Sequence, residues 1–587
     1  MQKEQISGNI IDIHVLKRLY KYIKPYALQF YVLIFLTIAL GVVAPVRPIL
    51  VSKAIDDYVS VRDYNGLLNI TIILIVLVAI AGIFQYLHTY LSGWLGQYII
   101  KDIRIKLYEH LLRMQLKFFD KTPIGRLVTR TVSDIETLSE VFSQGLAELI
   151  ADVLQLTFIL IFMFYLDWEL TLVSLSTFPL LVISTYFFKE KIKHAFNEVR
   201  TAVSNLNSFV QEHITGMSIV QIFNSEDREY KKFKEINKEH RRSNIKSVLY
   251  YSIYYPVSEV IQALGIGLIV WFGAKGVVQD HTTFGDLTAF IMYLNMFFRP
   301  IRQIADRYNT LQMGIVSSSR IFDLLDNVEQ IPNDGKFAPR RLKGAVEFKD
   351  VWFAYNDEDY VLKDLNFHVS EGETIALVGA TGAGKSSIIN LLTRFYDINS
   401  GEILVDGVAV KDYELQTLRN NIGVVLQDVF LFSDTIEANI NLGNYEIGRN
   451  KIYEAAELVG AKNFIERLPG KLEYNVMERG ATLSVGQRQL ISFIRAMVYD
   501  PKILVLDEAT SSVDTETEEM IQNAIRKMMS GRTSVVIAHR LSTIQNAKKI
   551  LVLDHGRIVE SGNHHELLAK NGYYTQLYNM QYKAIAG

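Results

Sequence analysis

Long runs without charged residues alternate with basic segments over the first half of the chain. Residues 25–46 and 64–100 carry no charge, and four further apolar runs follow at residues 141–166, 170–188, 247–272 and 285–311. A helix needs about 20 apolar residues to cross ~30 Å of hydrocarbon. The pattern therefore predicts six membrane-spanning helices, of which the last is the weakest because only residues 287–298 of its run are free of charge.

Lysine and arginine are unevenly shared among the connections between these runs. The segments after the second and fourth runs are strongly basic, whereas residues 167–169 carry no basic residue and Lys275 alone lies between the fifth and sixth runs. Basic connections stay in the cytoplasm, so both long connections and both termini are predicted there. Both connections are mostly helix-forming, and we expect two helical hairpins with tips at residues 117–130 and 212–226.

A basic amphipathic stretch precedes the first run. It contains Lys17, Arg18, Lys21 and Lys24, and no small-residue cleavage site follows the first run. We therefore interpret this stretch as an anchor and not as a removed signal peptide.

Several charged residues lie inside the apolar runs, where they are costly and often functional. They are Arg47 at the outer end of the first span, Glu148 and Asp152 in the third, Glu259 in the fifth, and Arg299, Arg302, Asp306 and Arg307 in the sixth. One interpretation is a polar cavity for substrate, with Glu148 or Asp152 opposite Arg302. The other is that these residues form pairs between helices or lie at the membrane edge.

In the second half of the chain, charged residues occur throughout, and the apolar runs are short instead of membrane-spanning. Strand-like runs lie at residues 345–353, 361–369, 374–378, 401–405, 422–426, 502–506, 533–537 and 549–553, with helical patterns between several of them. This alternation predicts an α/β domain, and the short turns between the early strands favour a mixed sheet. The expected division is a membrane domain at 1–319, a polar connector at 320–344 and a soluble domain at 345–587.

Composition narrows the classes of function. The formal net charge is −2 and no basic face dominates the soluble half, so we expect no nucleic-acid partner. The chain has no cysteine, which excludes disulfides, thiolate metal sites and a cysteine nucleophile.

A glycine-rich segment follows the strand-like run at 374–378. Its residues are Gly379, Ala380, Thr381, Gly382, Ala383, Gly384, Lys385, Ser386 and Ser387. Such a turn between a strand and a helix points several backbone N–H groups into one concavity, and Lys385 adds a positive charge, so the segment can hold two phosphates. The hydroxyl of Ser386 is a candidate ligand of Mg²⁺.

Four polar residues stand at the ends of buried strands. Asp507 can hold Mg²⁺ through water, and the next residue, Glu508, can act as general base toward the attacking water. His539 is placed to bind the γ-phosphate, and Gln427 to reach the metal or the water. Each alone is more often structural, but four of them beside one phosphate loop predict a site for nucleotide hydrolysis.

The segment LSVGQ has no explanation within one subunit. It contains Ser484, Val485, Gly486 and Gln487, at the start of an expected helix. A serine and a glycine at a helix N-terminus form a second anion site.

Together these motifs resemble the ATP-binding cassette superfamily. GATGAGKS is similar to its Walker A loop, ILVLDE to its Walker B strand with the catalytic glutamate, and LSVGQ to its signature. Gln427, Asp514 and His539 correspond to the Q-loop, D-loop and H-loop, and residues 478–480 are similar to the X-loop of exporters. Tyr355 matches the aromatic residue that stacks on adenine. The membrane half resembles the six-helix domain of the exporters, whose two coupling helices match the predicted hairpin tips.

The resemblance implies a half-transporter that acts as a dimer, either a homodimer or a heterodimer with a related chain. ATP with Mg²⁺ would lie between two cassettes, so that Ser484 and Gly486 meet the γ-phosphate held by the partner's Lys385. Closure of the cassettes would move the membrane helices, and hydrolysis with Glu508 as base would reopen them. Val485 departs from the glycine common at its position, and a β-branched residue disfavours unusual backbone angles there.

The expected function is ATP-driven export of amphipathic small molecules or lipids, by alternating access, across the cytoplasmic membrane of a bacterium. The chain would combine a six-helix transmembrane domain with an α/β P-loop domain that has a mixed sheet and a helical subdomain. The alternative is an ATP-gated membrane sensor or channel regulator with little transport, which the intact Glu508 and His539 disfavour.

Overall fold

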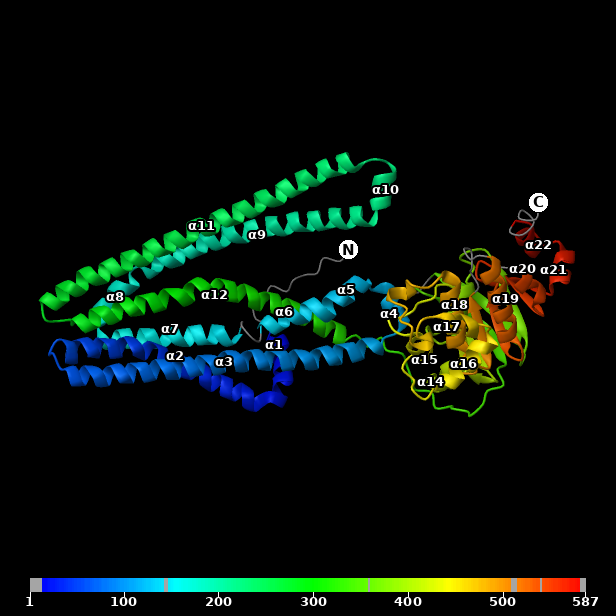
Figure 1. Ribbon diagram of the computed structural model, residues 1–587, viewed down its shortest axis with the longest axis horizontal. Coiled ribbons are helices and arrows are strands. Elements are labelled where there is room, and N and C mark those ends of the chain that lie inside the picture. The colour runs from blue at the N-terminus through cyan, green and yellow to red at the C-terminus, as the bar shows by residue number, and fades with distance from the viewer. Residues whose placement is uncertain (1–12, 142–145, 357–358, 508–514, 539–540, 581–587) are drawn as a thin grey trace. The chain divides into compact units, whose positions relative to one another are not determined.

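The computed structural model describes residues 13–141, 146–356, 359–507, 515–538 and 541–580 (Figure 1). Their contacts divide the chain into two compact units. One comprises Met1–Leu112 and Ile124–Asn327, and the other comprises Arg113–Pro123 and Val328–Gly587. The short segment Arg113–Pro123 therefore belongs with the second unit, although it lies within the first predicted hairpin.

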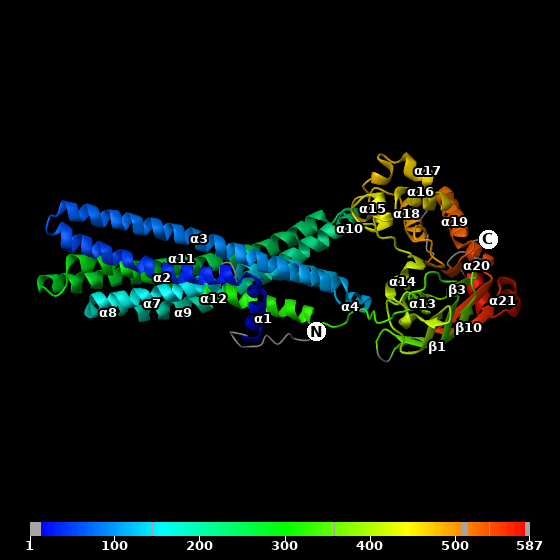
Figure 2. The ribbon, with the colours of Figure 1, turned by 90° about the horizontal axis from the view of Figure 1, so that it is seen from below.

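The described part of the first unit is helical, and its long helices run side by side (Figure 1, Figure 2). The helices are α1 (Ile13–Ile23), α2 (Ala27–Lys53), α3 (Tyr64–Leu112), α5 (Ile124–Thr129), α6 (Ile135–Glu140), α7 (Leu146–Leu166), α8 (Trp168–Leu175), α9 (Phe178–Thr215), α10 (Met217–Ile222), α11 (Glu226–Val278) and α12 (Phe284–Leu325). A 3₁₀ turn at Lys24–Tyr26 joins α1 to α2.

Five helical segments of the described chain are long and apolar enough to cross a membrane. They are Lys17–Val59, Tyr64–Leu112, Glu148–Leu166, Trp168–Thr215 and Glu226–Val278. The sixth predicted span falls in α12, which is a continuous helix of 42 residues but is not one of these five. The prediction of six spans is supported for five helices and stays a prediction for the sixth.

The core of the first unit joins apolar side chains from several helices. Ile159 of α7, Leu181 of α9 and Phe290 of α12 are fully buried in it. The helices approach one another closely at small residues, since a Cβ on Gly273 of α11 would lie 2.5 Å from Leu287 Cδ1 of α12. Small residues at such crossings let membrane helices pack without a hydrophobic driving force.

The second unit begins with α4 (Leu116–Lys121) and continues as an α/β fold. Its strands are β1 (Val346–Ala354), β2 (Tyr360–Val369), β3 (Thr374–Gly379), β4 (Ser400–Val405), β5 (Val408–Ala409), β6 (Ile422–Val425), β7 (Ile503–Asp507), β8 (Thr533–Ile537), β9 (Lys549–Asp554) and β10 (Arg557–Gly562). Its further helices are α13 (Lys385–Leu392), α14 (Leu415–Asn420), α15 (Ile436–Asn441), α16 (Arg449–Leu458), α17 (Lys462–Arg467), α18 (Val485–Met497), α19 (Thr515–Met529), α20 (Leu541–Asn546), α21 (His564–Lys570) and α22 (Tyr573–Tyr578).

These strands form two sheets. The order in the smaller sheet is β2-β1-β4-β5, and the order in the larger sheet is β10-β9-β3-β8-β7-β6. The larger sheet is mixed, because β10 alone pairs antiparallel to its neighbour. We expected the early strands to join this sheet, but they form a separate antiparallel sheet. Short connections join β1 to β2 and β4 to β5, whereas β1 pairs with β4 across a long stretch of chain.

Three hydrophobic clusters stabilise the described part of the second unit, and the smallest of them joins β3 and β9 to α20, α21 and α22. Of the other two, one lies between the sheets and around α13, with Leu362, Ile375 and Ile388 buried. The other joins α15, α16, α17, α18 and α19 to β6 and β7. This last cluster defines a helical subdomain beside the larger sheet (Figure 2).

Candidate functional site

The glycine-rich segment forms the turn between β3 and α13. Gly382 and Gly384 have φ angles of +84° and +98°, which other residues rarely adopt. A Cβ on Gly384 would lie 2.6 Å from Leu362 Cδ2, and one on Gly379 would lie 2.3 Å from the carbonyl oxygen of Leu553. Glycine is therefore required in this turn, which leads directly into the N-terminus of α13, the kind of position that attracts phosphate.

Lys385 is folded back over this turn. The residue is 9% exposed, and its Nζ donates to the carbonyl oxygens of Gly379 at 2.7 Å and Ala380 at 2.9 Å. Burial lowers the pKa of Lys385, and the charge of the nearby Asp507 carboxylate acts in the opposite direction. The ammonium group is held at the turn, where it can form charge-assisted hydrogen bonds with phosphate oxygens.

Other candidate residues stand at the same edge of the larger sheet. β3, β8, β7 and β6 are parallel neighbours, so their carboxyl ends share one edge. The phosphate loop follows β3, Asp507 ends β7, and the exposed Gln427 follows β6; Ser386 is exposed in the first turn of α13. Ligands of open α/β sheets bind at such an edge. The roles of these residues toward phosphate and metal stay predictions.

Three candidate residues lie outside the described part of the chain. They are Glu508, Asp514 and His539. Their predicted roles in hydrolysis and at the dimer interface stay predictions.

Tyr355 stands beside α13, immediately after β1. Its hydroxyl lies 3.0 Å from Ser387 Oγ and accepts a hydrogen bond of 3.2 Å from Asn390 Nδ2. The ring packs edge-on against Phe353 and Tyr396, with centroids 4.7 and 4.9 Å apart. These contacts fix the ring next to the phosphate loop, and its role as a platform for adenine stays a prediction.

The LSVGQ segment caps α18 in the helical subdomain. Ser484 Oγ accepts from the backbone N–H of Gln487 at 3.2 Å, and Gln487 Oε1 accepts from the backbone N–H of Ser484 at 3.0 Å. This reciprocal capping box fixes the helix start. Val485 is the first residue of the helix and is 48% exposed, so its β-branched side chain meets no strained backbone. Gly486 is buried, whereas Ser484 is exposed.

The helix α4, from the tip of the first predicted hairpin, is docked in the second unit. The backbone N–H of Gln115 donates to the carbonyl oxygen of Glu329 at 3.0 Å, and Phe118 is buried. Tyr396 donates its hydroxyl proton to Asp120, and burial with this hydrogen bond raises the pKa of Tyr396. Because Tyr396 also touches the ring of Tyr355, α4 is linked to the phosphate loop through two aromatic side chains.

Sequence reasoning placed residues 117–130 at a hairpin tip but did not single out Asp120, Tyr396 or Asn390. The aromatic pair Phe395 and Tyr396, directly after α13, was a signal available in the sequence.

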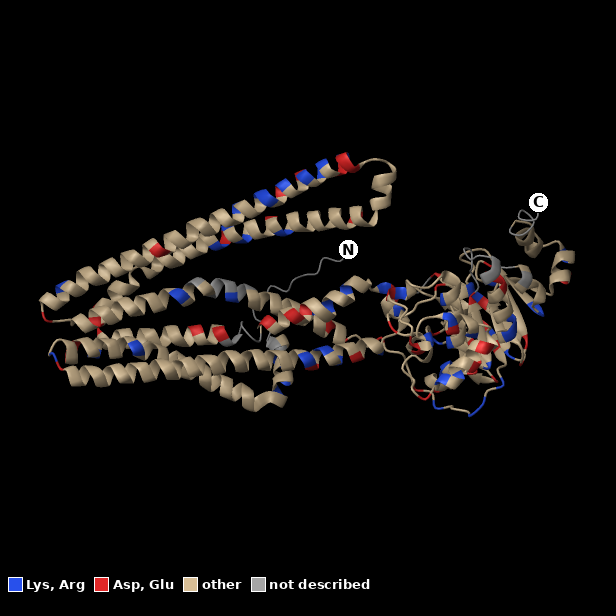
Figure 3. Cartoon of the chain, in the orientation of Figure 1, with Lys and Arg blue, Asp and Glu red and all other residues tan. Residues whose placement is uncertain are grey.

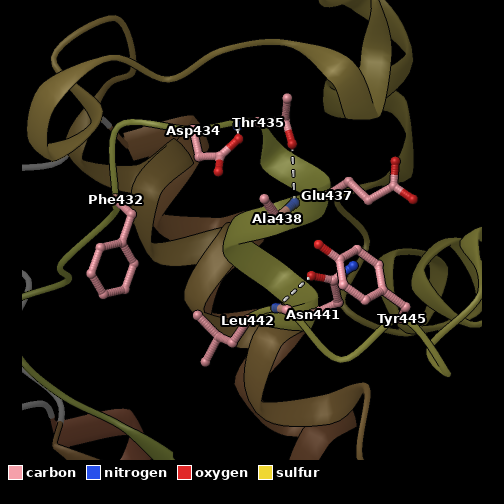
Figure 4. A pocket seen from close by; sticks show the side chains of 9 residues that line it. Phe432, Asp434, Thr435, Glu437, Ala438, Asn441, Leu442 and Tyr445 are labelled. Carbon is pink, nitrogen blue, oxygen red and sulfur yellow. Dashed lines mark hydrogen bonds between the residues drawn. The ribbon is translucent and has the colours of Figure 1, made fainter. Parts of the chain in front are cut away.

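A groove of about 730 Å³ lies over α15 (Figure 4). Its exposed apolar side chains are Phe432, Leu442 and Tyr445, and Asp434 and Glu437 add charge. Thr435 caps the helix by accepting from the N–H of Ala438 at 3.1 Å. The groove was not predicted, and it presents an apolar surface separate from the phosphate loop.

The tip of the second hairpin is the short helix α10. Its apolar residues Met217, Ile219 and Ile222 are exposed. The two helices that flank α10 are joined to each other, because His213 Nε2 of α9 lies 2.9 Å from Glu229 Oε2 of α11. The tip therefore presents an apolar surface on a fixed support.

The charges within the apolar helices include an ion-paired group. Arg307 of α12 contacts both Glu148 and Asp152 of α7, with 2.7 Å between its Nε and Asp152 Oδ2. Pairing between helices is the interpretation that this arrangement favours for the two carboxylates. Arg47 and Glu259 are exposed. The side chain of Arg302, expected opposite the carboxylates, lies outside the described part.

Two family models match the chain. The model of the ABC transporter transmembrane region matches residues 30–301, and the ABC transporter model matches residues 362–511.

Relatives cover nearly the whole chain. It is 39% identical over 570 residues to "Uncharacterized ABC transporter ATP-binding protein YknV" of Bacillus subtilis, which covers 96% of this chain and 94% of the relative. The chain is 35% identical over 570 residues to "ATP-dependent lipid A-core flippase" of Syntrophus aciditrophicus. This alignment covers 97% of the chain and 95% of the relative. The chain is also 39% identical over 507 residues to "Probable multidrug resistance ABC transporter ATP-binding/permease protein YheH" of Bacillus subtilis. This alignment covers 85% of the chain and 74% of the relative.

The fold, the phosphate loop and these similarities define an ATP-binding membrane protein. The chain belongs to the ABC transporter family and resembles its multidrug and lipid exporters.

Proposed function

We propose that the chain is one half of a dimeric exporter that uses ATP to move amphipathic small molecules or lipids across the cytoplasmic membrane by alternating access. The docking of α4 carries this proposal. A segment from between the membrane helices contacts Tyr396, which in turn contacts Tyr355 beside the phosphate loop. A change at the nucleotide can therefore reach α4, which the chain joins directly to α3 and α5.

Each subunit would bind and hydrolyse ATP with its own loop. The turn at 379–384 and Lys385 would hold the phosphates, and Ser386, Gln427 and Asp507 would hold Mg²⁺, directly or through water. Glu508 would take a proton from water as the water oxygen attacks the γ-phosphorus and ADP leaves. His539 would bind the γ-phosphate, and Tyr355 would stack on adenine.

The second subunit would complete each site, and it would be a second copy of this chain or a related chain. Ser484, Val485, Gly486 and Gln487 would lie at the γ-phosphate held by the partner's Lys385, and Asp514 would lie at the interface. The exposed position of Ser484 at the N-terminus of α18 supports this role, because helix N-termini attract anions. A ligand that binds the closed state more tightly shifts the population toward it.

The substrate class rests on similarity and on chemistry. Relatives at 35–39% identity carry the names of a lipid A-core flippase and a multidrug transporter. Both kinds of substrate are amphipathic. We place both termini and the ATP-binding domain in the cytoplasm, from the distribution of lysine and arginine.

The test uses the full chain in proteoliposomes with a Glu508→Gln variant. Loss of a general base is expected to lower ATP hydrolysis about 100-fold or more, and ATP-dependent movement of a fluorescent lipid or dye should be lost with it. Glu519→Gln, an exposed carboxylate on α19, is the matched control and should keep both activities. Hydrolysis without transport, accompanied by a nucleotide-gated conductance, would instead favour the sensor or channel regulator.

A further inference from the structure

The helix α1 has two opposite faces. Its apolar face is buried against α3 and α12, and it comprises Val15, Leu19 and Ile23. Its opposite face carries the exposed residues Lys17 and Lys21, and the exposed Lys24 follows at the start of the 3₁₀ turn; these three lysines form a basic stripe. The spacing of four and then three residues places the three lysines one above another along the helix and the turn.

Among the described residues, the ion pairs of α1 involve Arg18 and not the basic stripe. In the part of the chain that the structure describes, no carboxylate forms an ion pair with any of its three lysines. The neighbouring Arg18 differs, because its Nη1 and Nη2 donate to Asp326 at 2.5 and 2.8 Å and its guanidinium lies 4.2 Å from the ring centre of Phe322. The apolar face of α1 is therefore covered by other helices of the protein, whereas the three lysines of the basic stripe are exposed and can bind an external anion.

The position of α1 places the basic stripe next to the first membrane span. α2 begins three residues after Lys24 and is 27 residues long, so it reaches about 40 Å and crosses the bilayer without help from α1. Leu28 and Tyr31, in the first turns of α2, are 74% and 60% exposed, as expected of side chains facing lipid.

The direction and charge of the neighbouring elements agree with this position. α1 turns away from the axis of α2 in both views (Figure 1, Figure 2). Figure 3 shows long uncharged stretches along the bundle, with charged residues gathered in the last part of α3, in the middle of α9 and in the part of α11 next to α10.

We propose that the basic stripe of α1 binds the headgroups of anionic phospholipids at the membrane surface where the first span begins. Basic residues beside a membrane span are attracted to anionic lipid, each by a factor of about five in affinity. The ion pair between Arg18 and Asp326 ties α1 to the end of α12, from which the chain continues into the ATP-binding unit. Lipid held by the stripe would therefore stabilise one position of that end and raise ATP hydrolysis; this second effect rests on the proposed function.

The experiment compares lipid binding by full-length variants in nanodiscs of phosphatidylcholine and phosphatidylglycerol. The variant Lys17→Gln, Lys21→Gln, Lys24→Gln should lose at least tenfold of the preference for phosphatidylglycerol, measured by native mass spectrometry of retained lipid. Arginine at the same three positions should keep the preference, because it keeps the charge. Stimulation of ATP hydrolysis by phosphatidylglycerol should fall in the glutamine variant alone.

The matched control changes three exposed lysines with similar spacing on α11. Lys231→Gln, Lys234→Gln, Lys238→Gln removes the same charge, but Lys238 lies nine residues from the apolar run at 247–272, about 14 Å along the helix and beyond the ~8 Å screening length. This control should bind lipid as the wild type does. Unchanged lipid preference in the glutamine variant of α1, or an equal loss in the control, would overturn the proposal and leave solvent or an acidic protein facing the stripe. A wild type that retains phosphatidylglycerol but hydrolyses no ATP would count against the proposed function and not against the lipid site.

Discussion

Tyr355 allows the ring and the hydroxyl to be tested separately. Its ring is the proposed adenine platform, whereas its hydroxyl is bound to Ser387 and Asn390. Tyr355→Ala should weaken ATP binding about tenfold or more, since stacking of a base on an aromatic ring contributes ~1–3 kcal/mol. Tyr355→Phe keeps the ring and should change the Kd less than threefold.

Titration with a fluorescent ATP analogue measures these dissociation constants. The matched control is Tyr360→Ala, which removes a tyrosine of β2 that packs on Trp352 and should leave ATP binding unchanged. Equal weakening by the alanine and phenylalanine variants of Tyr355 would assign the effect to the hydroxyl and refute the stacking role.

At the residue scale, local motifs were predictable and tertiary contacts were not. The phosphate loop was predictable because it requires glycine where a Cβ would clash or where φ is positive, and the spacing of these glycines is visible in the sequence. The contact of Asp120 with Tyr396 joins residues 276 positions apart, which no local pattern shows. Val485 departs from the glycine common at its position, and the structure places it in the first helical position of α18, where its backbone angles are ordinary.

At the element scale, apolar runs predicted the long helices because length and hydrophobicity are local properties. Five of the six expected spans are supported, and the charges of the sixth run are the physical reason for its weak signal. The segment that forms α4 was expected only as part of a hairpin tip, yet it packs in the second unit. The separate antiparallel sheet was also missed, because hydrophobic patterning does not show which strands pair.

The docking of α4 predicts the effect of removing one hydroxyl. Tyr396→Phe keeps the ring but removes the hydrogen bond to Asp120, and a hydrogen bond to a charged group contributes ~1.5–3 kcal/mol. Hydrogen exchange of the α4 amides should therefore speed up about tenfold or more, and transport should fall further than ATP hydrolysis. Tyr499→Phe, which removes a hydroxyl bound to the carbonyl oxygen of Asn441, is the control and should leave α4 unchanged. Unaltered exchange in Tyr396→Phe would show that the hydrogen bond does not hold α4.

At the scale of the whole molecule, one chain contains the phosphate loop and the signature in different parts of the ATP-binding unit. The loop joins the core between the two sheets, whereas α18 belongs to the core of the helical subdomain. The family similarity covers both parts and supports a dimer. The central claim is that the exposed N-terminus of α18 completes the ATP site of a second subunit.

The most direct measurement uses the absence of cysteine in the chain. We would introduce Ala380→Cys in the loop and Ser484→Cys in the signature and oxidise membranes in the presence of ATP. The account predicts a disulfide between two chains, seen as a species of twice 67.0 kDa that neither single variant forms. A disulfide within one chain, or no ATP-dependent cross-link, would contradict an ATP site shared between two copies.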